Sequence, residues 1–373
     1  MKITTILFSI DKAKEFEWYI DEIDRNRFEI SFISINEKEE THLKEYCEAH
    51  NVPFYHVSYQ SKKDILQAIF KTRKILKKLK PNIVHSHIFE GGLIGVTAAW
   101  LAGVKNRIYT RHYSDFHHVY YPNGLKYDKW INSKATHIVA VSEVVKSILI
   151  EKENVPSKKV SVIHHGIKNI DDSDTTIYDR ILKVKQKNSI PNSKIVIGVI
   201  SRYTKLKGLQ YIIPAFENLL ETQPNLHLVL ANAKGEFKSE IDLMLRKIPK
   251  SSYTEILFEN DSEALFKVFD VFVHVPVSRE SEAFGQIYIE ALKFGIPSIF
   301  SLSGIANEFI KDEENALVVK HESAEDIKLA VERLLKDDKL CENLIKNGKE
   351  AVKGFTTMKK TKALEALYLK IGS

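Results

Sequence analysis

Cysteine is scarce in this chain of 373 residues: the two that occur, Cys47 and Cys341, lie far apart and outside any ligand motif. Such scarcity argues against a disulfide framework and against a zinc site, and it fits a reducing compartment. Apolar runs long enough to span a membrane are also missing. Residues 2–9 are followed at once by charges, which predicts a first strand and not a signal peptide. We therefore expect a cytoplasmic location, or a peripheral one at the inner face of the cell membrane.

The charge is uneven along the chain. Residues 1–168 contain 26 Lys and Arg against 19 Asp and Glu, and they contain 11 of the 14 histidines, whereas the remaining residues contain 29 against 30. A modestly basic first half suits an anionic surface or substrate. The excess is too small to indicate nucleic acid, and no nucleic-acid motif is present. Hydrophobic residues at 44% and charged residues at 28% are typical of a soluble globular protein, and the length favours two domains.

Short β-rich segments alternate with helical ones along the chain, which predicts parallel sheets with helices on both faces. In the first half, strands are expected at 2–9, 28–35, 52–57, 82–87, 106–110, 137–141 and 159–163, and helices at 13–23, 38–50, 62–79, 90–102 and 142–150. In the second half, strands are expected at 195–200, 226–231, 254–258, 271–275, 297–301 and 316–319, and helices at 207–221, 237–247, 262–268, 284–294, 323–336, 338–352 and 359–371.

The segment 169–175 is polar and reads as a linker between two such halves. We predict a first domain at 1–168, a linker region at 169–190, a second domain at 191–358 and a C-terminal helix at 359–373. Doubly wound domains bind ligands at the carboxyl ends of their strands.

Two carboxylates, Glu282 and Glu290, flank a predicted loop-to-helix transition at Gly285. Gly295 would end that helix, and Pro297 would open the next strand. A helix start offers unpaired N–H groups and a partial positive charge, which suits a phosphate. The carboxylates could then accept hydrogen bonds from sugar and ribose hydroxyls on either side of a diphosphate. The alternative is one loop acid and one solvated helix acid.

The segment 281–298 resembles the nucleotide-sugar motif of the retaining glycosyltransferases of family 4, in which two glutamates with seven residues between them precede an Ala, a Gly and a Pro. The resemblance implies a GT-B fold: two Rossmann-like doubly wound domains that face each other across a cleft, with a C-terminal helix crossing back to the first domain. It also implies that Glu290 holds the ribose, and that Glu282 and the backbone of Ala283, Phe284 and Gly285 hold the sugar. Gln286 and Ile287 would also bind the donor.

The segment 201–208 supplies two cations, Arg202 and Lys207, after a predicted strand. These residue types are the usual partners of a diphosphate, although such a loop can also carry solvated charge. The arrangement is similar to the family's strand-Arg-x4-Lys-Gly signature, which implies that both residues neutralise the leaving nucleoside diphosphate. With the helix start they would make a metal unnecessary, so we expect no metal and no cofactor. We interpret Asp172 and Asp174, in the linker, as solvated charge.

Two further loops, 231–235 and 258–260, would flank the base in the resembling fold. The first lacks the Gly-x-Gly turn of many relatives, which leaves base recognition open. At the end of the strand 271–275, we interpret His274 as a packing residue.

His112 ends a predicted strand of the first half, where the family has a histidine that contacts the donor sugar or phosphate. A structural histidine is the alternative. Many relatives also have a glycine pair after the first strand, whereas this chain has none, so a close backbone approach is less expected there. The acceptor side would be formed by Asp11, Lys12, His87, Glu90, Gly91, Arg111 and Tyr113.

Two other segments of the first half could contact an acceptor or a membrane. The predicted helix at 62–80 has apolar residues on one side and eight Lys or Arg on the other, which is typical of a surface helix or of an anchor to anionic lipid. The segment 113–130 is rich in aromatic residues and histidine, which suit sugar faces and membrane interfaces.

The resemblance to family 4 implies a retaining glycosyltransferase. It would move a hexose or N-acetylhexosamine from a UDP- or GDP-sugar to a hydroxyl of a glycan or lipid-linked acceptor, in bacterial surface polysaccharide synthesis. The alternatives are a nucleotide-sugar 2-epimerase on the same fold and a catalytically silent subunit of a glycan assembly complex.

Overall fold

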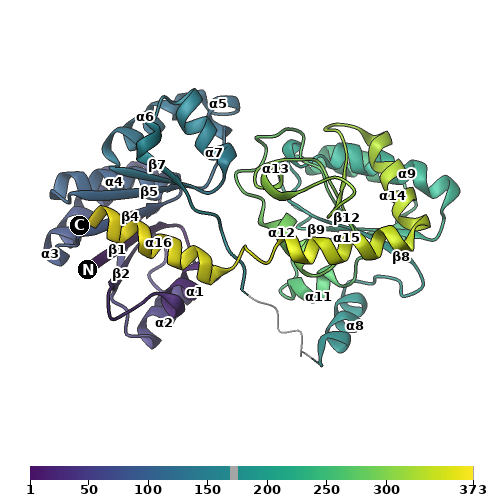
Figure 1. Cartoon of the computed structure of the whole chain (residues 1–373), viewed down its shortest axis with the longest axis horizontal. Coiled ribbons are helices and arrows are strands. Elements are labelled where there is room, and N and C mark those ends of the chain that lie inside the picture. The colour runs from purple at the N-terminus through teal and green to yellow at the C-terminus, as the bar shows by residue number, and fades with distance from the viewer. Residues whose placement is uncertain (169–174, 373) are drawn as a thin grey trace. The chain divides into compact units, whose positions relative to one another are not determined.

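The computed structural model describes residues 1–168 and 175–372, which form two compact units (Figure 1). The first unit comprises Met1–Lys168 and Phe355–Ser373, and the second comprises Asn169–Gly354. Residues 169–174 of the expected linker, with Asp172 and Asp174, lie outside the described residues.

The first unit is built on a seven-stranded parallel sheet with the order β3-β2-β1-β4-β5-β6-β7. Its inner strands are buried on both faces, as expected for a parallel sheet covered by helices. The order reverses between β1 and β4. The strands are β1 Lys2–Phe8, β2 Glu29–Asn36, β3 Phe54–Ser58, β4 Ile83–His87, β5 Asn106–Arg111, β6 His137–Ala140 and β7 Val160–Val162.

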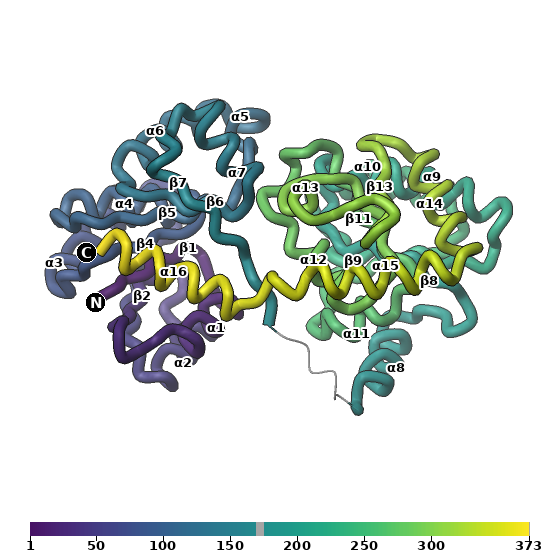
Figure 2. Tube along the Cα trace, in the orientation of Figure 1, coloured from purple at the N-terminus to yellow at the C-terminus, as the bar shows by residue number. Residues whose placement is uncertain are grey.

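Helices cover both faces of this sheet. α1 (Lys14–Glu22), α2 (His42–Ala49) and α16 (Thr357–Gly372) pack on one face, and α3 (Ile65–Leu79) and α4 (Phe89–Ala102) pack on the other. Figure 2 shows how α16 returns to lie beside α1. The other helical segments are η1 Lys62–Asp64, α5 Phe116–Val119, η2 Pro122–Gly124, α6 Leu125–Lys134, α7 Glu143–Ser147, η3 Ile148–Lys152 and η4 Ser157–Lys159.

The second unit repeats the plan with six parallel strands in the order β10-β9-β8-β11-β12-β13. Here the order reverses between β8 and β11. The strands are β8 Ile195–Ile200, β9 Leu226–Ala231, β10 Tyr253–Ile256, β11 Val271–His274, β12 Ser298–Phe300 and β13 Leu317–Val318. All thirteen expected strands are therefore present.

One face of the second sheet packs on α9 (Leu209–Thr222), α10 (Lys238–Leu245) and α14 (Ala324–Lys336). The other face packs on α11 (Ser262–Phe266) and α12 (Gln286–Lys293), through Phe266 against Phe272 and Tyr288 against Phe300. The remaining helical segments are α8 Ile177–Lys187, η5 Lys205–Lys207, η6 Lys250–Ser252, α13 Ala306–Phe309 and α15 Asp338–Ala351. Among the residues with a described position, no helix is long and apolar enough to span a bilayer.

Four of the described α-helices were not expected from the sequence: the single turns α5 and α13, and the longer α6 and α8. α6 begins inside the aromatic segment 113–130, and its buried face carries Asp128 and Asn132, so apolar periodicity does not reveal it. α8 lies in the expected linker region, yet it packs against α11, and Arg180 forms a bidentate pair with Asp261 at 2.6 and 2.7 Å.

Candidate functional site

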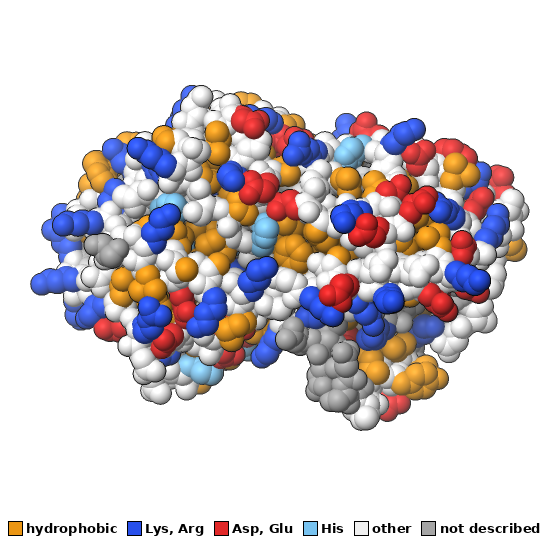
Figure 3. Space-filling view, in the orientation of Figure 1, with side chains coloured by type: hydrophobic (Ala, Val, Ile, Leu, Met, Phe, Trp, Pro, Cys, Tyr) orange, Lys and Arg blue, Asp and Glu red, His pale blue; other side chains and the backbone are white. Residues whose placement is uncertain are grey.

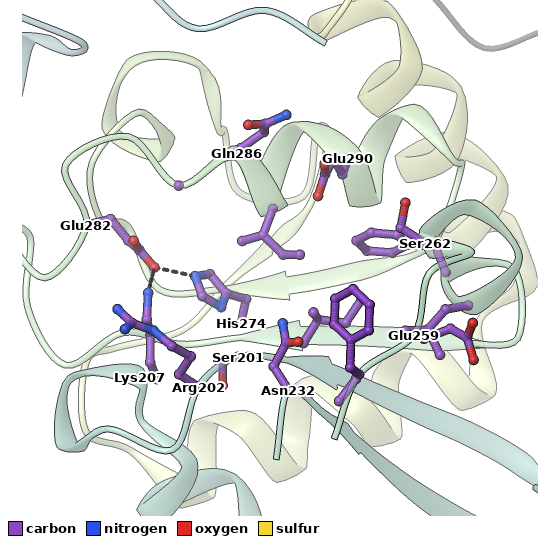
Figure 4. Close-up of a pocket in the computed structure, with 17 residues that line it drawn as sticks. Ser201, Arg202, Lys207, Asn232, Glu259, Ser262, His274, Glu282, Gln286 and Glu290 are labelled. Atoms are coloured by element: carbon purple, nitrogen blue, oxygen red, sulfur yellow. Dashed lines mark hydrogen bonds and ion pairs between the residues drawn. The ribbon is translucent and has the colours of Figure 1, made fainter. Parts of the chain in front are cut away.

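A cavity of about 440 Å³ lies at the carboxyl ends of the strands in the second sheet. It is located between β8 and β11, where the strand order reverses, which is the usual ligand position in doubly wound sheets. Its walls come from β8, β9, β11, α11 and the first turns of α12 (Figure 4). The polar side chains that line it are Ser201, Arg202, Lys207, Asn232, Glu259, Ser262, His274, Glu282, Gln286 and Glu290.

The start of α12 forms one wall of this cavity. Gly285 precedes the helix with a φ of +84°, a left-handed conformation that favours glycine. A Cβ atom at this position would lie 2.7 Å from the ring of Tyr288, so the turn has no room for a side chain. Gly285 offers no side chain to cap the helix, so the first N–H groups of α12 are left to a ligand or to water. Gly295, with a φ of +74°, follows the helix as expected.

Glu282 lies just before this turn and forms the centre of a charged cluster. Lys207 Nζ lies 2.5 Å from its Oε1, and His274 Nε2 lies 3.0 Å from the same atom. Burial by itself would raise the pKa of Glu282, but Lys207 and His274 outweigh burial and lower that pKa to about 2. The carboxylate is therefore ionised at neutral pH.

The backbone of Glu282 is fixed as well. Its N–H donates to Ser303 Oγ at 2.9 Å, and Ser303 Oγ donates to the carbonyl of Arg279 at 3.1 Å. Gly304, with a φ of +54°, packs so closely that an added Cβ would lie 2.9 Å from Glu282 Cβ. Both side-chain partners of Glu282 in the described chain bind Oε1, so Oε2 can accept from a substrate hydroxyl.

The polar side chains are divided between the two ends of the cavity. Figure 4 shows Arg202, Lys207 and Glu282 together at one end, with Glu259 and Ser262 at the other. Arg202 is exposed. Such a cavity can hold an elongated anion, with its charge near the cations and the start of α12, and with a neutral ring near Ser262.

Glu290 lies on α12, one turn inside the helix and between those two ends (Figure 4). This is where the sequence motif predicts a ribose contact. Gln286 and Ile287 also line the cavity, whereas Ala283 and Phe284 do not. The Phe284 side chain is buried, and its carbonyl accepts from Ile305 N–H at 2.8 Å. The predicted contact of its backbone with the sugar stays a prediction.

The far end of the cavity is braced by the unexpected helix α8. Glu259 lines the cavity, and its Oε2 accepts from Lys187 at 2.9 Å and from Asn188 at 3.3 Å. Burial opposes the ionised form of Glu259, but these bonds together lower its pKa. Asn232 adopts a φ of +62° at the end of β9, a left-handed conformation that asparagine tolerates better than most residues.

The first unit has its own cavity of about 530 Å³, where its strand order reverses between β1 and β4. The segment Ser9–Phe16 forms one wall, and His87, Ile88 and His112 form the other. Ser9 has a φ of +50° without being a glycine. The loop therefore makes the left-handed turn for which the missing glycine pair would be suited, at a cost in backbone strain.

Four buried or nearly buried histidines form a row beside this cavity. His87 Nδ1 lies 3.1 Å from His112 Nε2, the ring of His165 stacks on His112 at 5.2 Å, and the ring of His85 lies 4.2 Å from His87. Burial lowers the pKa of His85 and His112 to about 3 and that of His165 to about 4. All three rings are therefore neutral at pH 7.

Partners outside the row hold it in place. His165 Nδ1 bonds to Glu15 at 2.9 Å, and Glu15 also contacts Lys360 of α16. His85 bonds to Tyr368 of α16 at 2.8 Å. Neither Glu15 nor His165 belongs to a recognisable motif, so their part in this row could not be predicted from the sequence.

The other predicted acceptor residues divide into two groups. Asp11 and Lys12 are exposed and line the cavity with His87. Glu90 and Gly91 lie in the first turn of α4 next to Ile88, outside the lining, and Gly91 packs against Phe8.

The expectation for Arg111 and Tyr113 is not supported by their positions. Arg111 is fully buried and forms a bidentate pair with Glu153 at 2.7 and 3.2 Å, and the Tyr113 hydroxyl donates to Asp128. Neither side chain lines the cavity. A buried guanidinium needs all its donors paired, so this network holds the loop after β5 together and presents no free cation to an acceptor.

His274 was predicted to be a packing residue, and the structure places it in the wall of the cavity as well. It is buried at 1% exposure, as a packing residue would be, but it lines the cavity and bonds to Glu282. Its spacing of eight residues from Glu282 was visible in the sequence, but the turn that brings the two together was not.

Comparison with known proteins agrees with this geometry. Residues 181–351 match the family model described as glycosyl transferases group 1, and residues 20–169 match the model described as Glycosyltransferase Family 4. The two matches lie on different parts of the chain and together cover most of it.

Similar proteins span nearly the whole chain. The capsular polysaccharide biosynthesis glycosyltransferase CapM of Staphylococcus aureus is 27% identical over 367 residues, covering 94% of this chain and 92% of CapM. The Escherichia coli UDP-Gal:alpha-D-GlcNAc-diphosphoundecaprenol alpha-1,3-galactosyltransferase is 26% identical, with 82% and 79% covered.

The crystal structure of Anabaena HepE with UDP and glucose superposes with a TM-score of 0.81 at 16% identity, covering 98% of this chain and 99% of HepE. This likeness confirms the predicted α/β fold with two Rossmann-like domains. By its fold, by both family matches and by its relatives, the chain belongs to the GT-B glycosyltransferases of the family 4 type.

Proposed function

We propose that this protein is a retaining glycosyltransferase that moves a hexose or N-acetylhexosamine from a UDP- or GDP-sugar to a hydroxyl group. The observation that carries the proposal is the cluster of Arg202, Lys207 and Glu282 at the start of α12. Two cations and a helix start favour a diphosphate, and a fixed carboxylate beside them favours the hydroxyls of the attached sugar.

Each residue of the cluster has a defined task in this proposal. Arg202 and Lys207 stabilise the negative charge that develops on the diphosphate as the bond to the sugar breaks. Glu282 accepts from sugar hydroxyls through Oε2, and Glu290 accepts from the ribose. The acceptor oxygen attacks from the face that the phosphate leaves, and the leaving phosphate takes the acceptor's proton, so the path needs no side-chain nucleophile and gives retention.

The names of similar proteins support a uridine donor and a surface glycan. HepE was crystallised with UDP-glucose, and the E. coli relative is named for a UDP-Gal donor and a diphosphoundecaprenol-linked acceptor. CapM is named for capsular polysaccharide biosynthesis. We propose a lipid-linked or glycan acceptor that reaches the cavity of the first unit near His87, His112 and Asp11.

A membrane-associated acceptor would bring the first unit to a lipid surface. On α3, Leu66 and Phe70 are 69% and 59% exposed, although other apolar residues of that helix are buried. Lysines surround them, and Figure 3 shows Lys and Arg side chains gathered at this edge of the first unit. Exposed apolar residues among lysines favour a peripheral contact with anionic lipid at the inner face of the membrane.

The first test is the release of nucleoside diphosphate from a panel of UDP- and GDP-sugars, with and without EDTA. Wild-type protein should hydrolyse one donor slowly without an acceptor, and Glu282→Ala should lose this activity. The matched control is Glu280→Ala, because Glu280 lies two residues away and does not line the cavity. Metal chelation should not change the rate. Conversion of the donor to its 2-epimer would indicate the epimerase instead.

A measurement of nucleotide binding distinguishes an active transferase from the remaining alternative, a catalytically silent subunit. Binding of UDP or GDP without turnover, even with lipid-linked acceptors, would indicate a silent subunit. Once an acceptor is known, the anomeric configuration of the product decides the stereochemistry, and an inverted product would refute retention.

The lipid contact is tested by flotation with vesicles of anionic and of neutral lipid. Binding should require anionic lipid and fall as salt increases. Lys71→Glu with Lys74→Glu, two exposed positions of α3, should abolish it, whereas Lys336→Glu in the second unit should not. Equal binding to neutral vesicles would contradict this part of the proposal.

A further inference from the structure

His274 occupies a buried position at the end of β11, next to the end of the cavity where Glu282 and Lys207 lie. Its ring is 1% exposed and packs edge-on against Tyr288, with centroids 4.9 Å apart. Nε2 lies 3.0 Å from Glu282 Oε1, while Nδ1 is buried and has no hydrogen-bond partner among the described residues.

These contacts fix the tautomer of the ring. Burial keeps the pKa of His274 below its ordinary value, although Glu282 acts in the opposite direction, so the ring is neutral at pH 7. An ionised carboxylate only accepts hydrogen bonds, so Nε2 must carry the proton and Nδ1 must be bare. A buried, unpaired ring nitrogen is destabilising, and a phenylalanine would fill the same space without it. The bond to Glu282 is therefore the reason for a histidine here.

A bound ligand would affect Lys207 and His274 differently. The Lys207 ammonium ends a four-carbon stem with rotatable bonds, and its side chain is 18% exposed, so it can turn to a phosphate, whereas the His274 side chain is 2% exposed and is short. A bound diphosphate would compete with Glu282 for the ammonium group of Lys207, since both are anions. His274 would then be the remaining side-chain partner of the carboxylate within the described chain.

We infer that His274 is a positioning residue for Glu282: its Nε2–H holds the carboxylate toward the sugar while Lys207 binds the diphosphate of the donor. The inference rests on the proposed function for the identity of the ligand. A fixed Oε1 leaves Oε2 directed at a sugar hydroxyl, and a carboxylate without His274 would rotate away from it or follow Lys207.

The first experiment compares His274→Phe and His274→Gln with wild-type protein, using the donor that wild-type protein turns over. His274→Phe keeps the ring and removes the donor, and kcat/KM should fall about 10- to 100-fold, mainly in kcat. UDP lacks the transferred sugar that Glu282 would hold, so its affinity should change less than about twofold. His274→Gln keeps an N–H donor at a similar reach and should recover most of the loss.

The control and the coupling test separate positioning from packing. His227, a buried strand histidine of β9 bonded to Thr254, lies outside the cavity, and His227→Gln should leave kcat/KM unchanged. In a Glu282→Gln background, His274→Phe should cost little more, because the carboxylate that it positions is absent. An equal loss in both backgrounds, or wild-type kinetics for a folded His274→Phe variant, would overturn the inference.

A third measurement does not depend on turnover. ¹⁵N spectra of histidine-labelled full-length protein, with His274→Gln for assignment, should show a neutral Nε2–H ring at pH 7 to 8. The titratable side chains facing this ring are Glu282, Lys207 and Tyr288. A protonated ring or the Nδ1–H tautomer would refute the inference even if the proposed function held. Failure of wild-type protein to bind or use any nucleotide sugar would refute the proposed function and leave this result standing.

Discussion

Each unit has a cavity where the strand order of its parallel sheet reverses, but different kinds of residue line the two cavities. In the second unit, two cations, three carboxylates and a helix start line the cavity between β8 and β11. In the first unit, two neutral histidines line the cavity between β1 and β4, together with a strained loop and the start of α1, which carry Asp11, Lys12, Lys14 and Glu15. The cavity of the second unit suits a diphosphate held by cations and a helix start, whereas the cavity of the first unit combines neutral rings with charges of both signs.

The two cavities also differ in how far apart their residues lie in the sequence. Arg202 and Lys207 lie on one loop, and Glu282 and Glu290 flank one turn, so each group is local in the sequence. The first cavity instead combines residues from the ends of β1, β4 and β5, far apart in the chain, and His165 stacks on His112 behind them. Local spacing can be recognised in a sequence, whereas a site assembled by the fold cannot.

The largest effect should come from the charge of the second cavity. Lys207→Ala removes the cation nearest to Glu282, and we expect kcat/KM for the donor to fall about 10³-fold, with weaker UDP binding. Steady-state kinetics and calorimetry measure the two effects. Lys205→Ala is the matched control, because Lys205 is an exposed lysine of the same short helix η5 and does not line the cavity. A loss below threefold for Lys207→Ala would show that the diphosphate binds elsewhere.

A substitution of Arg111 tests whether this residue stabilises the first unit or contacts the acceptor. Arg111→Met would leave Glu153 and Asp128 buried without their cation, and we expect the free energy of unfolding of the first unit to fall by about 3–5 kcal/mol. Urea unfolding followed by circular dichroism measures this fall. UDP binding by the second unit should persist at low denaturant concentration.

Lys105→Met changes an exposed residue close to Arg111 in the chain and should alter stability by less than about 0.5 kcal/mol. If Arg111→Met were equally mild but raised the KM for the acceptor, the original assignment of Arg111 to the acceptor site would be right.

Most of the fold followed from the sequence because parallel strands buried on both faces are continuous apolar runs. The turn at Gly285 and the ends of α12 followed from glycine and proline positions. α6 was missed because Asp128 is buried by its pairing with Arg111 and His117, and pairing of polar residues leaves no periodic signal. His274 was predicted only as a packing residue, because the sequence does not reveal the turn that brings Glu282 to its ring.

Acid should destabilise the first unit more than the second. The pKa values of His85, His112 and His165 are below their ordinary value of about 6.5, so the unfolded chain binds more protons and stability falls as pH decreases below 6.5. Each histidine contributes a loss of about 1.4 kcal/mol per pH unit until its own folded pKa is reached. The depressed pKa of Glu282 acts only below about 4.5, where carboxylates begin to protonate.

Hydrogen exchange at pH 6.5 and 5.5, corrected for intrinsic rates, compares the two sheets directly. The second unit has two described histidines with a lowered pKa, His227 and His274, so its loss of stability between these pH values should be smaller. His165→Gln should reduce the loss in the first unit. Equal losses in both sheets would mean that the row of histidines does not determine the pH dependence.

The smallest effect should come from an exposed residue of the first cavity. Lys12 lines that cavity, and Lys12→Ala should lower transfer to the acceptor by about three- to tenfold while leaving hydrolysis of the donor in water unchanged. Lys38→Ala, at another exposed position of the first unit, should affect neither rate. Assays of both rates on the same preparations make the comparison, because hydrolysis needs only the donor and transfer needs both ligands. A parallel fall of both rates would place Lys12 at the donor, and the division of tasks between the two cavities would then be wrong.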